Sequence, residues 1–218
     1  MTTRIRDAVV VGGGPAGLAF AAAAASRGLD VTLLESRALP ADKACGEGLL
    51  PPALRALAAL GADRYVPEGE GARFRELRWL EPDGTGAALA LPAPGGLGLR
   101  RTVLSAALLA RAREAGAELV TGAAVDGHAV ERDRVVVRAG TLRLEARVLV
   151  AADGLGSPIR RRAGLDRPRR GPARFGVRRH YRLAPWADAV EVHFGRGVEA
   201  YVTPAGPSRV GVAFLFDR

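Results

Sequence analysis

The chain has 218 residues, 48% of them apolar, which is enough for one large domain or two small ones with a real core. Its net charge of +9 comes almost wholly from arginine, since Lys43 is the only lysine. With abundant Ala and Gly, this bias is typical of a GC-rich bacterial genome, and we expect no nucleic-acid partner. The single cysteine, Cys45, excludes an intrachain disulfide. With no space for a signal peptide and no apolar helix of spanning length, we expect a cytoplasmic protein without a transmembrane segment.

A strand, a glycine-rich turn, a helix and a second strand open the chain. Residues 8–11 are apolar, and Gly12, Gly14 and Gly17 follow in a G-x-G-x-x-G pattern. In a βαβ unit these glycines permit the tight turn, the approach of a pyrophosphate to the backbone, and close helix packing. Glu35 ends the second strand, 18 residues after Gly17, where a carboxylate can accept hydrogen bonds from a ribose. The pattern predicts dinucleotide binding; the alternative is a Gly-rich turn of an ordinary α/β protein.

The middle of the chain predicts short helices and strands. Pro51 and Pro52 open a helix that ends at Gly61, and strands are expected at 73–80 and 87–91. A Pro/Gly-rich connection, residues 92–98, leads to an amphipathic helix at 101–115.

The second half of the chain predicts mostly strands. A buried strand at 118–121 is followed by three antiparallel strands at 125–130, 134–138 and 141–147. Residues 148–152 are apolar throughout and predict a return to a central parallel sheet. Four further strands are expected at 175–182, 190–194, 198–203 and 209–215.

Three motifs occur in a fixed order along the chain. They are Gly12–Gly17 with Glu35, Arg101-Thr102-Val103-Leu104 at the head of a helix, and A-D-G-x-x-S-x-x-R from Ala152 to Arg160. Together they resemble the FAD-dependent oxidoreductases related to p-hydroxybenzoate hydroxylase, which include aromatic and polyketide hydroxylases, geranylgeranyl reductases and flavin-dependent halogenases.

The resemblance implies an α/β fold with two parts. A Rossmann-like FAD-binding domain, with a parallel central sheet and an antiparallel three-stranded meander, would comprise residues 1–72 and 100–170. A mostly antiparallel substrate-domain sheet would comprise residues 73–99 and 171–218. Members of the superfamily carry a further Gly-Asp motif beyond this sheet, which the chain lacks. We therefore expect the N-terminal portion of a longer protein, the alternative being a shortened member that has lost part of its flavin site.

The resemblance also implies the cofactor-binding residues. FAD would be bound through its pyrophosphate, its adenosine and its ribityl chain, and no metal ligands are expected. The pyrophosphate would contact Gly12, Gly14, Pro15, Ala16, Gly17 and Arg101; the adenosine would contact Glu35, Ser36 and the backbone of Val125; the ribityl side would contact Asp153 and Gly154.

A loop at Lys43–Pro51 resembles one that flanks the flavin ring in monooxygenase-like and reductase-like members. Its Cys45 is the one candidate for a catalytic side chain, the alternative being a small buried thiol without chemistry. Gly48 replaces the serine of the Gly-Glu-Ser loop of halogenases, which disfavours halogenase activity. The scattered histidines are expected to be structural or exposed; they are His128, His180 and His193.

The resemblance implies redox chemistry carried by the flavin, with NAD(P)H as a transient electron donor, since only one nucleotide-binding fingerprint is present. The first interpretation is a monooxygenase acting on an apolar aromatic, polyketide or isoprenoid small molecule. A geranylgeranyl-reductase-like enzyme and a non-catalytic flavin- or NAD-binding fragment are the alternatives. The arginine-rich stretch from Arg160 to Arg174 predicts either an anionic partner, such as an acidic acyl carrier protein, or a solvated surface loop.

Overall fold

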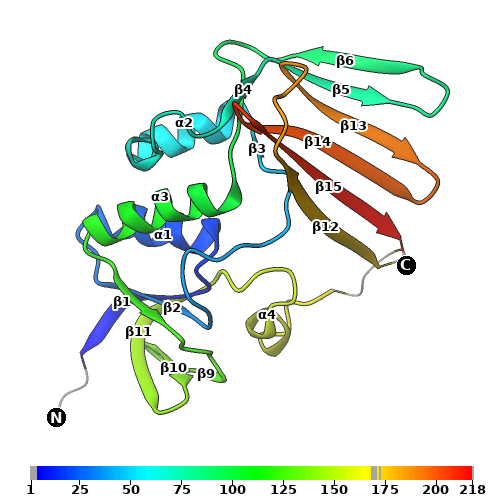
Figure 1. Cartoon of the computed structure of the whole chain (residues 1–218). Coiled ribbons are helices and arrows are strands. Elements are labelled where there is room, and N and C mark those ends of the chain that lie inside the picture. The colour runs from blue at the N-terminus through cyan, green and yellow to red at the C-terminus, as the bar shows by residue number, and fades with distance from the viewer. Residues whose placement is uncertain (1–3, 168–170, 172, 218) are drawn as a thin grey trace. The chain divides into compact units, whose positions relative to one another are not determined.

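Residues 4–167, 171 and 173–217 are described by a computed structural model with an α/β fold (Figure 1). Contacts divide the chain into two units: residues 1–41 with 105–168, called the first unit, and residues 42–104 with 169–218, called the second unit. Residues 42–72 and 100–104, which the sequence prediction placed in the FAD-binding domain, thus belong to the second unit. The division of labour between an FAD-binding domain and a substrate-domain sheet stays a prediction.

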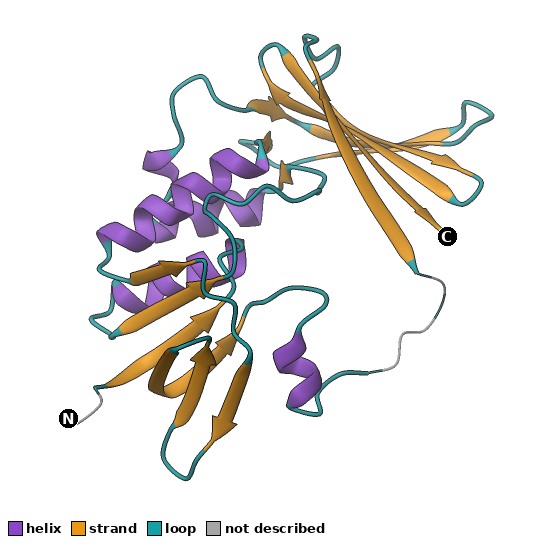
Figure 2. Cartoon of the chain, turned by 60° about the horizontal axis from the view of Figure 1, so that its bottom comes forward, coloured by secondary structure: helices purple, strands orange, loops and turns teal. Residues whose placement is uncertain are grey.

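The first unit contains a six-stranded sheet that joins the parallel strands and the meander (Figure 2). Its strands, in spatial order, are β8 (Glu118–Thr121), β2 (Val31–Glu35), β1 (Ile5–Val11), β11 (Leu142–Ala151), β10 (Val135–Ala139) and β9 (Gly127–Val130). β8, β2, β1 and the second half of β11 run parallel, whereas β11, β10 and β9 pair antiparallel. All residues of β2 are buried, as expected for a central strand of a parallel sheet.

Strand β11 corrects one expectation. Separate strands were predicted at 141–147 and 148–152, but the structure has one continuous strand of ten residues. Its first half pairs with β10, up to Ala146, and its second half pairs with β1, from Glu145 to Ala151. No Gly or Pro interrupts the sequence between the two halves, so the strand changes partners without turning. Among the described residues, 148–151 of β11 are paired with β1 alone.

The second unit is built mainly from two sheets. The larger sheet has the strand order β12 (Arg174–Tyr181), β15 (Arg209–Asp217), β14 (Val198–Gly206), β13 (Ala189–Gly195), β5 (Glu76–Leu80) and β6 (Gly86–Ala90). Only the β13–β5 pair is parallel, which agrees with the expected, mostly antiparallel sheet. The smaller sheet contains β3 (Gly48–Leu49), β7 (Gly96–Gly98) and β4 (Ala72–Phe74). Strands β3 and β7 were missed because they are short and glycine-rich, and β7 corrects the end of the expected connection at 92–98. The single strand expected at 73–80 is interrupted at Arg75, so that β4 joins the smaller sheet and β5 the larger one.

Four α-helices complete the described part of the chain. They are α1 (Pro15–Ala25), α2 (Pro51–Leu60), α3 (Arg101–Glu114) and the short α4 (Pro158–Arg162), with a 3₁₀ turn at Asp63–Tyr65. Helix α2 ends at Gly61 in a left-handed conformation, as its sequence predicted. None of the helices in the described ranges is long and apolar enough to cross a membrane.

Candidate functional site

The turn between β1 and α1 leaves no room for side chains. Gly12 has a φ of +109°, and a β-carbon there would overlap the carbonyl oxygen of Ala152. A β-carbon on Gly17 would overlap the carbonyl oxygen of Gly12. The N-cap residue of α1, Gly14, has no side-chain capping bond, and Pro15 follows at the start of the helix. With no capping side chain at Gly14, the helix presents the partial positive charge of its N-terminal backbone at the turn.

Glu35 lies at the end of β2 and is buried, with 7% of its surface exposed. Its Oε2 accepts a hydrogen bond from the backbone N–H of Gly13 at 2.7 Å, and its Oε1 accepts from the N–H of Arg37 and the hydroxyl of Ser36 at 3.0 Å each. Burial raises the pKa of Glu35, but these hydrogen bonds, with the charge of Arg37, outweigh it, so the pKa lies below its ordinary value of 4.5. The residue is therefore an ionised acceptor directly beside the glycine turn.

Asp153 follows β11 and lies on the same edge of the sheet as the glycine turn. A β-carbon built on Gly12 would come within 2.9 Å of the backbone nitrogen of Asp153, and the N–H of Ala152 donates to the oxygen of Val11 at 2.8 Å. Among the described residues, Asp153 Oδ1 is buried and has no hydrogen-bond partner, while Oδ2 accepts weakly from Ile159 N at 3.4 Å. A buried, unpaired carboxylate oxygen at this position is a vacant acceptor for a ligand.

The predicted adenosine-side residues also meet at this edge. β8 pairs with β2 in register with Glu35, and the N–H of Ala123 donates to the carbonyl oxygen of Glu35 at 3.0 Å. This hydrogen bond brings the segment that contains Val125 beside the ribose-side acid, and Ser36 contacts the same carboxylate. The roles of Val125 and Ser36 in binding stay predictions.

Arg101 belongs to the second unit, and so its proximity to the pyrophosphate also stays a prediction. Within that unit its backbone N–H begins α3 and donates to Glu47 Oε1 at 2.7 Å. Its Nε is buried and has no hydrogen-bond partner among the described residues.

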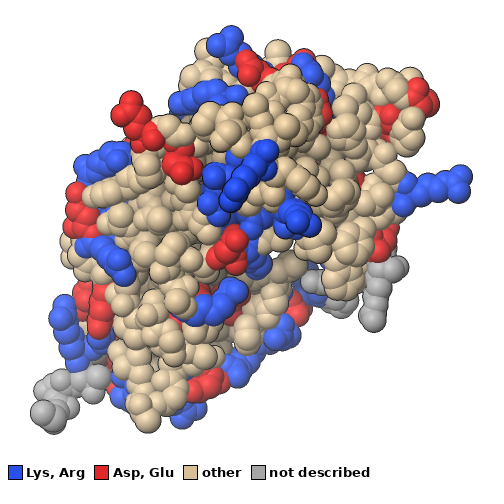
Figure 3. Space-filling model, viewed as in Figure 1, with Lys and Arg blue, Asp and Glu red and all other residues tan. Residues whose placement is uncertain are grey.

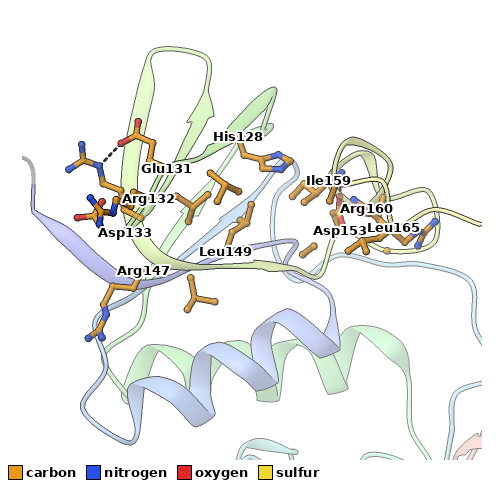
Figure 4. A pocket seen from close by; sticks show the side chains of 18 residues that line it. His128, Glu131, Arg132, Asp133, Arg147, Leu149, Asp153, Ile159, Arg160 and Leu165 are labelled. Atoms are coloured by element: carbon orange, nitrogen blue, oxygen red, sulfur yellow. Dashed lines mark hydrogen bonds and ion pairs between the residues drawn. The ribbon is translucent and has the colours of Figure 1, made fainter.

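A hollow of about 790 Å³ lies in the first unit, beside the second half of β11 (Figure 4). Figure 4 shows His128 and Glu131 of the meander on one side, and on the other Asp153, Ile159 of α4 and Leu165. Its lining includes apolar side chains that are strongly exposed: Val130, Val148 and Leu165. The hollow thus extends from Asp153 along the unpaired side of β11.

Glu47, a buried charged residue of the second unit, was not predicted from the sequence. Its side chain is 1% exposed and contacts Arg178 and His180 of β12. His180, expected to be structural or exposed, is part of this cluster. Cys45, two residues away, is a free thiol that is half-buried. The local signal was an acid between two glycines, Gly46 and Gly48, but the partners lie more than 130 residues away in the sequence.

The residues of the first unit fit the adenine dinucleotide that the sequence predicts. A turn that excludes side chains suits a pyrophosphate, and an ionised carboxylate suits a ribose diol. Beside the turn, Asp153 Oδ1 is an acceptor without a hydrogen-bond partner among the described residues. Residues 6–204 match the family model of the FAD binding domain. The chain belongs to this family.

Relatives of this FAD-binding protein include two reductases. It is 36% identical over 167 residues to the menaquinone reductase of Mycobacterium tuberculosis strain H37Rv, an alignment that covers 72% of this chain and 40% of the relative. It is 32% identical over 171 residues to the digeranylgeranylglycerophospholipid reductase of Methanosarcina acetivorans, covering 74% of this chain and 41% of the relative. The chain therefore spans about two fifths of the length of these curated relatives.

Solved structures agree on the fold. A geranylgeranyl bacteriochlorophyll reductase-like protein from Thermoplasma acidophilum has a TM-score of 0.80 at 25% identity, covering 99% of this chain and 57% of the other. The flavin-dependent halogenase CmlS has a TM-score of 0.86 at 24% identity, covering 100% of this chain and 42% of the other. At that identity the halogenase shows a shared fold and nothing about activity.

Proposed function

We propose that this chain is the FAD-binding portion of an oxidoreductase that reduces a carbon–carbon double bond in an isoprenoid small molecule. The observation that carries the proposal is the identity of 36% and 32% to proteins named menaquinone reductase and digeranylgeranylglycerophospholipid reductase. Since the chain spans about two fifths of each relative, the activity belongs to the whole protein.

The chain's own residues would bind and orient the cofactor. The backbone of residues 12–17 and the start of α1 would hold the pyrophosphate, and Glu35 would accept hydrogen bonds from the ribose hydroxyls. The negative charge of ionised Glu35 disfavours a cofactor with a phosphate on the 2′ position of this ribose. Asp153 Oδ1 would accept a hydrogen bond from the flavin side of the cofactor. FAD, when bound, supplies the two-electron transfer from NAD(P)H that such a reduction requires.

Oxygen transfer, the first interpretation from the sequence, becomes the second candidate. It is supported by likeness to the FAD-dependent monooxygenase PqsL of Pseudomonas aeruginosa, at a TM-score of 0.81 but 22% identity. Such a likeness speaks for the fold, whereas the reductases are similar in sequence over most of this chain.

Anaerobic turnover of the FAD-loaded protein separates the two candidates. With NADPH or NADH and a prenylated quinone or prenyl lipid, a reductase yields a product with one double bond fewer, detected by a mass gain of two hydrogens. A monooxygenase yields product only when O₂ is admitted and incorporates one oxygen atom. No oxidation of NADPH or NADH with any prenylated substrate, with or without O₂, would contradict the proposal.

The third interpretation, a flavin- or NAD-binding fragment without activity, is tested by calorimetry on the 218-residue chain. Tight, stoichiometric binding of FAD and weak binding of NAD support the flavoprotein. The reverse preference would indicate an NAD-binding protein and would remove the basis of the reductase proposal. A cytoplasmic location stays a prediction.

An acidic carrier protein at Arg160–Arg174 also stays a prediction. Several of these arginines bind acceptors of their own chain: Arg160 pairs with Asp166, Arg161 donates to Gly156 O, and Arg174 pairs with Glu199. Arg169 and Arg170 lie outside the described residues. On the face viewed in Figure 3, basic and acidic side chains are interspersed. The charge left to attract an acidic protein is thus smaller than the sequence suggested.

A further inference from the structure

We propose that Glu47 is a positioning residue that fixes the loop Asp42–Gly48, and with it Cys45, against β12 and the start of α3. A place for this loop beside the flavin is what the sequence resemblance implies, and the proposal does not depend on it. The contacts that carry it lie within the second unit and need no cofactor.

The Glu47 carboxylate has three partners from two other segments. Its Oε1 accepts from Nη1 of Arg178 and from the backbone N–H of Arg101, the latter at 2.7 Å. Its Oε2 lies 2.6 Å from Nε2 of His180. With 1% of the side chain exposed, this carboxylate is sequestered from water and depends on these partners for compensation.

Arg178 ties both ends of the loop to the same guanidinium group. Its Nη1 reaches Glu47, while its Nη2 reaches the two carboxylate oxygens of Asp42 at 2.7 and 2.9 Å. Only 9% of the Arg178 side chain is exposed. Cys45 lies between the two acids in sequence, so the guanidinium group of Arg178 closes the loop that contains it, with a buried bond at Glu47 and an exposed one at Asp42, whose side chain is 51% exposed.

The backbone of Glu47 supports a dedicated role for its side chain. Its φ is +57°, the only positive value among the described non-glycine residues. Glycine would adopt this conformation without strain, yet the position between Gly46 and Gly48 is occupied by an acid. The carbonyl oxygen of Glu47 also accepts from the N–H of Leu99 at 2.8 Å, just before α3. Backbone and side chain thus fasten the loop to the same helix start.

The reactivity of the single thiol measures whether the loop is held. In the 218-residue chain without flavin, we expect Ellman's reagent to modify Cys45 at least about tenfold faster in Glu47→Gln than in the wild type, because one partner of a buried ion cluster is lost and the loop opens locally. A nearby charge also changes the fraction of Cys45 that is thiolate. Modification rates measured over a range of pH separate this effect from a change in the accessibility of the thiol to the reagent. Glu47→Asp, which restores the charge, should return much of the protection.

The matched control is Glu199→Gln, which removes an acid from the same unit; Glu199 pairs with Arg174 and Tyr201 rather than with the loop. It should label within about twofold of the wild type, since an exposed pair contributes little. A folded Glu47→Gln chain that labels at the wild-type rate would overturn the proposal, as would equal acceleration by Glu199→Gln. If Glu47→Gln does not fold, Arg178→Gln is used instead. A rate of Cys45 modification in that variant equal to the wild-type rate would also overturn the proposal. Because no flavin is present, failure of FAD to bind leaves this test intact.

Discussion

The two units hold their candidate site residues by different means. In the first unit the candidate binding groups come mainly from the backbone, at a turn that excludes side chains and at the start of α1, where Gly14 makes no side-chain cap. Asp153 adds one side-chain oxygen, Oδ1, that has no hydrogen-bond partner among the described residues. In the second unit, interactions between side chains hold the candidate residues, and Glu47 is buried in contact with Arg178 and His180. The first arrangement offers groups that a ligand can bind, whereas in the second both carboxylate oxygens of Glu47 are already bound by groups of the same chain. Substitutions in the first unit should therefore lower cofactor affinity more than they lower the stability of the fold.

The largest expected effect comes from filling the turn. Gly17→Ala places a β-carbon against the carbonyl oxygen of Gly12, and the strain of overpacking moves the backbone that would receive the pyrophosphate. We expect FAD affinity, measured by calorimetry, to fall at least about 100-fold. Gly176→Ala is the control, because a β-carbon there has only an ordinary contact, 3.8 Å from Phe214 O. Equal FAD affinity in the two variants would show that the turn does not bind the cofactor.

Removing the vacant acceptor should have the next largest effect. Asp153→Ala deletes Oδ1, which has no hydrogen-bond partner among the described residues, and Oδ2, which accepts only a long bond of 3.4 Å from Ile159 N. FAD affinity should therefore fall about 10- to 100-fold, the equivalent of one hydrogen bond to a charged group. The melting temperature of the flavin-free chain should stay the same or rise, because an unpaired buried oxygen is lost. A lower melting temperature with unchanged affinity would assign Asp153 a structural role instead.

Glu35 should couple acid stability and cofactor binding. Because its pKa is lowered in the folded chain, its ionisation stabilises the fold above pH 4.5, and this stabilisation is lost as the pH falls through the lowered value. In Glu35→Gln the free energy of unfolding should therefore decrease less steeply below pH 4.5, and FAD affinity should drop about tenfold. Asp83→Asn, in an exposed turn, should leave FAD affinity unchanged. An identical acid profile for Glu35→Gln and the wild type would contradict this account.

The smallest effect is expected from an exposed ion pair of the first unit. Arg160 and Asp166 are 2.8 Å apart, with 38% and 40% of their side chains exposed. Asp166→Asn should change the free energy of unfolding by less than about 1 kcal/mol in urea titrations. A loss comparable to that of breaking a buried pair, about 3–5 kcal/mol, would erase the contrast between the two units.

The features that could be predicted from sequence are those set by short-range spacing. The turn from Gly12 to Gly17, the acid Glu35 and the start of α3 all follow from residues close together in the chain. The edge shared by Asp153 and Gly12 followed from the expectation that both strands belong to one parallel sheet, which the β1–β11 pairing confirms.

What escaped prediction depends on contacts between distant residues. Glu47 and Arg178 are 131 positions apart, and nothing in the spacing of either links them. The continuity of β11 also escaped, because the change of partner from β10 to β1 is a property of the sheet rather than of the strand's own sequence. Such features appear only once the strands have been arranged in space.

The hydrogen bonds of Glu35 have a consequence for the kinetics of cofactor uptake. Gly13, Ser36 and Arg37 already hold the acid and the turn in place before any dinucleotide arrives. This part of the site is preorganised, so association has little conformational entropy to pay there. Binding of the adenosine half should accordingly be a single fast phase, without a slow step of loop ordering.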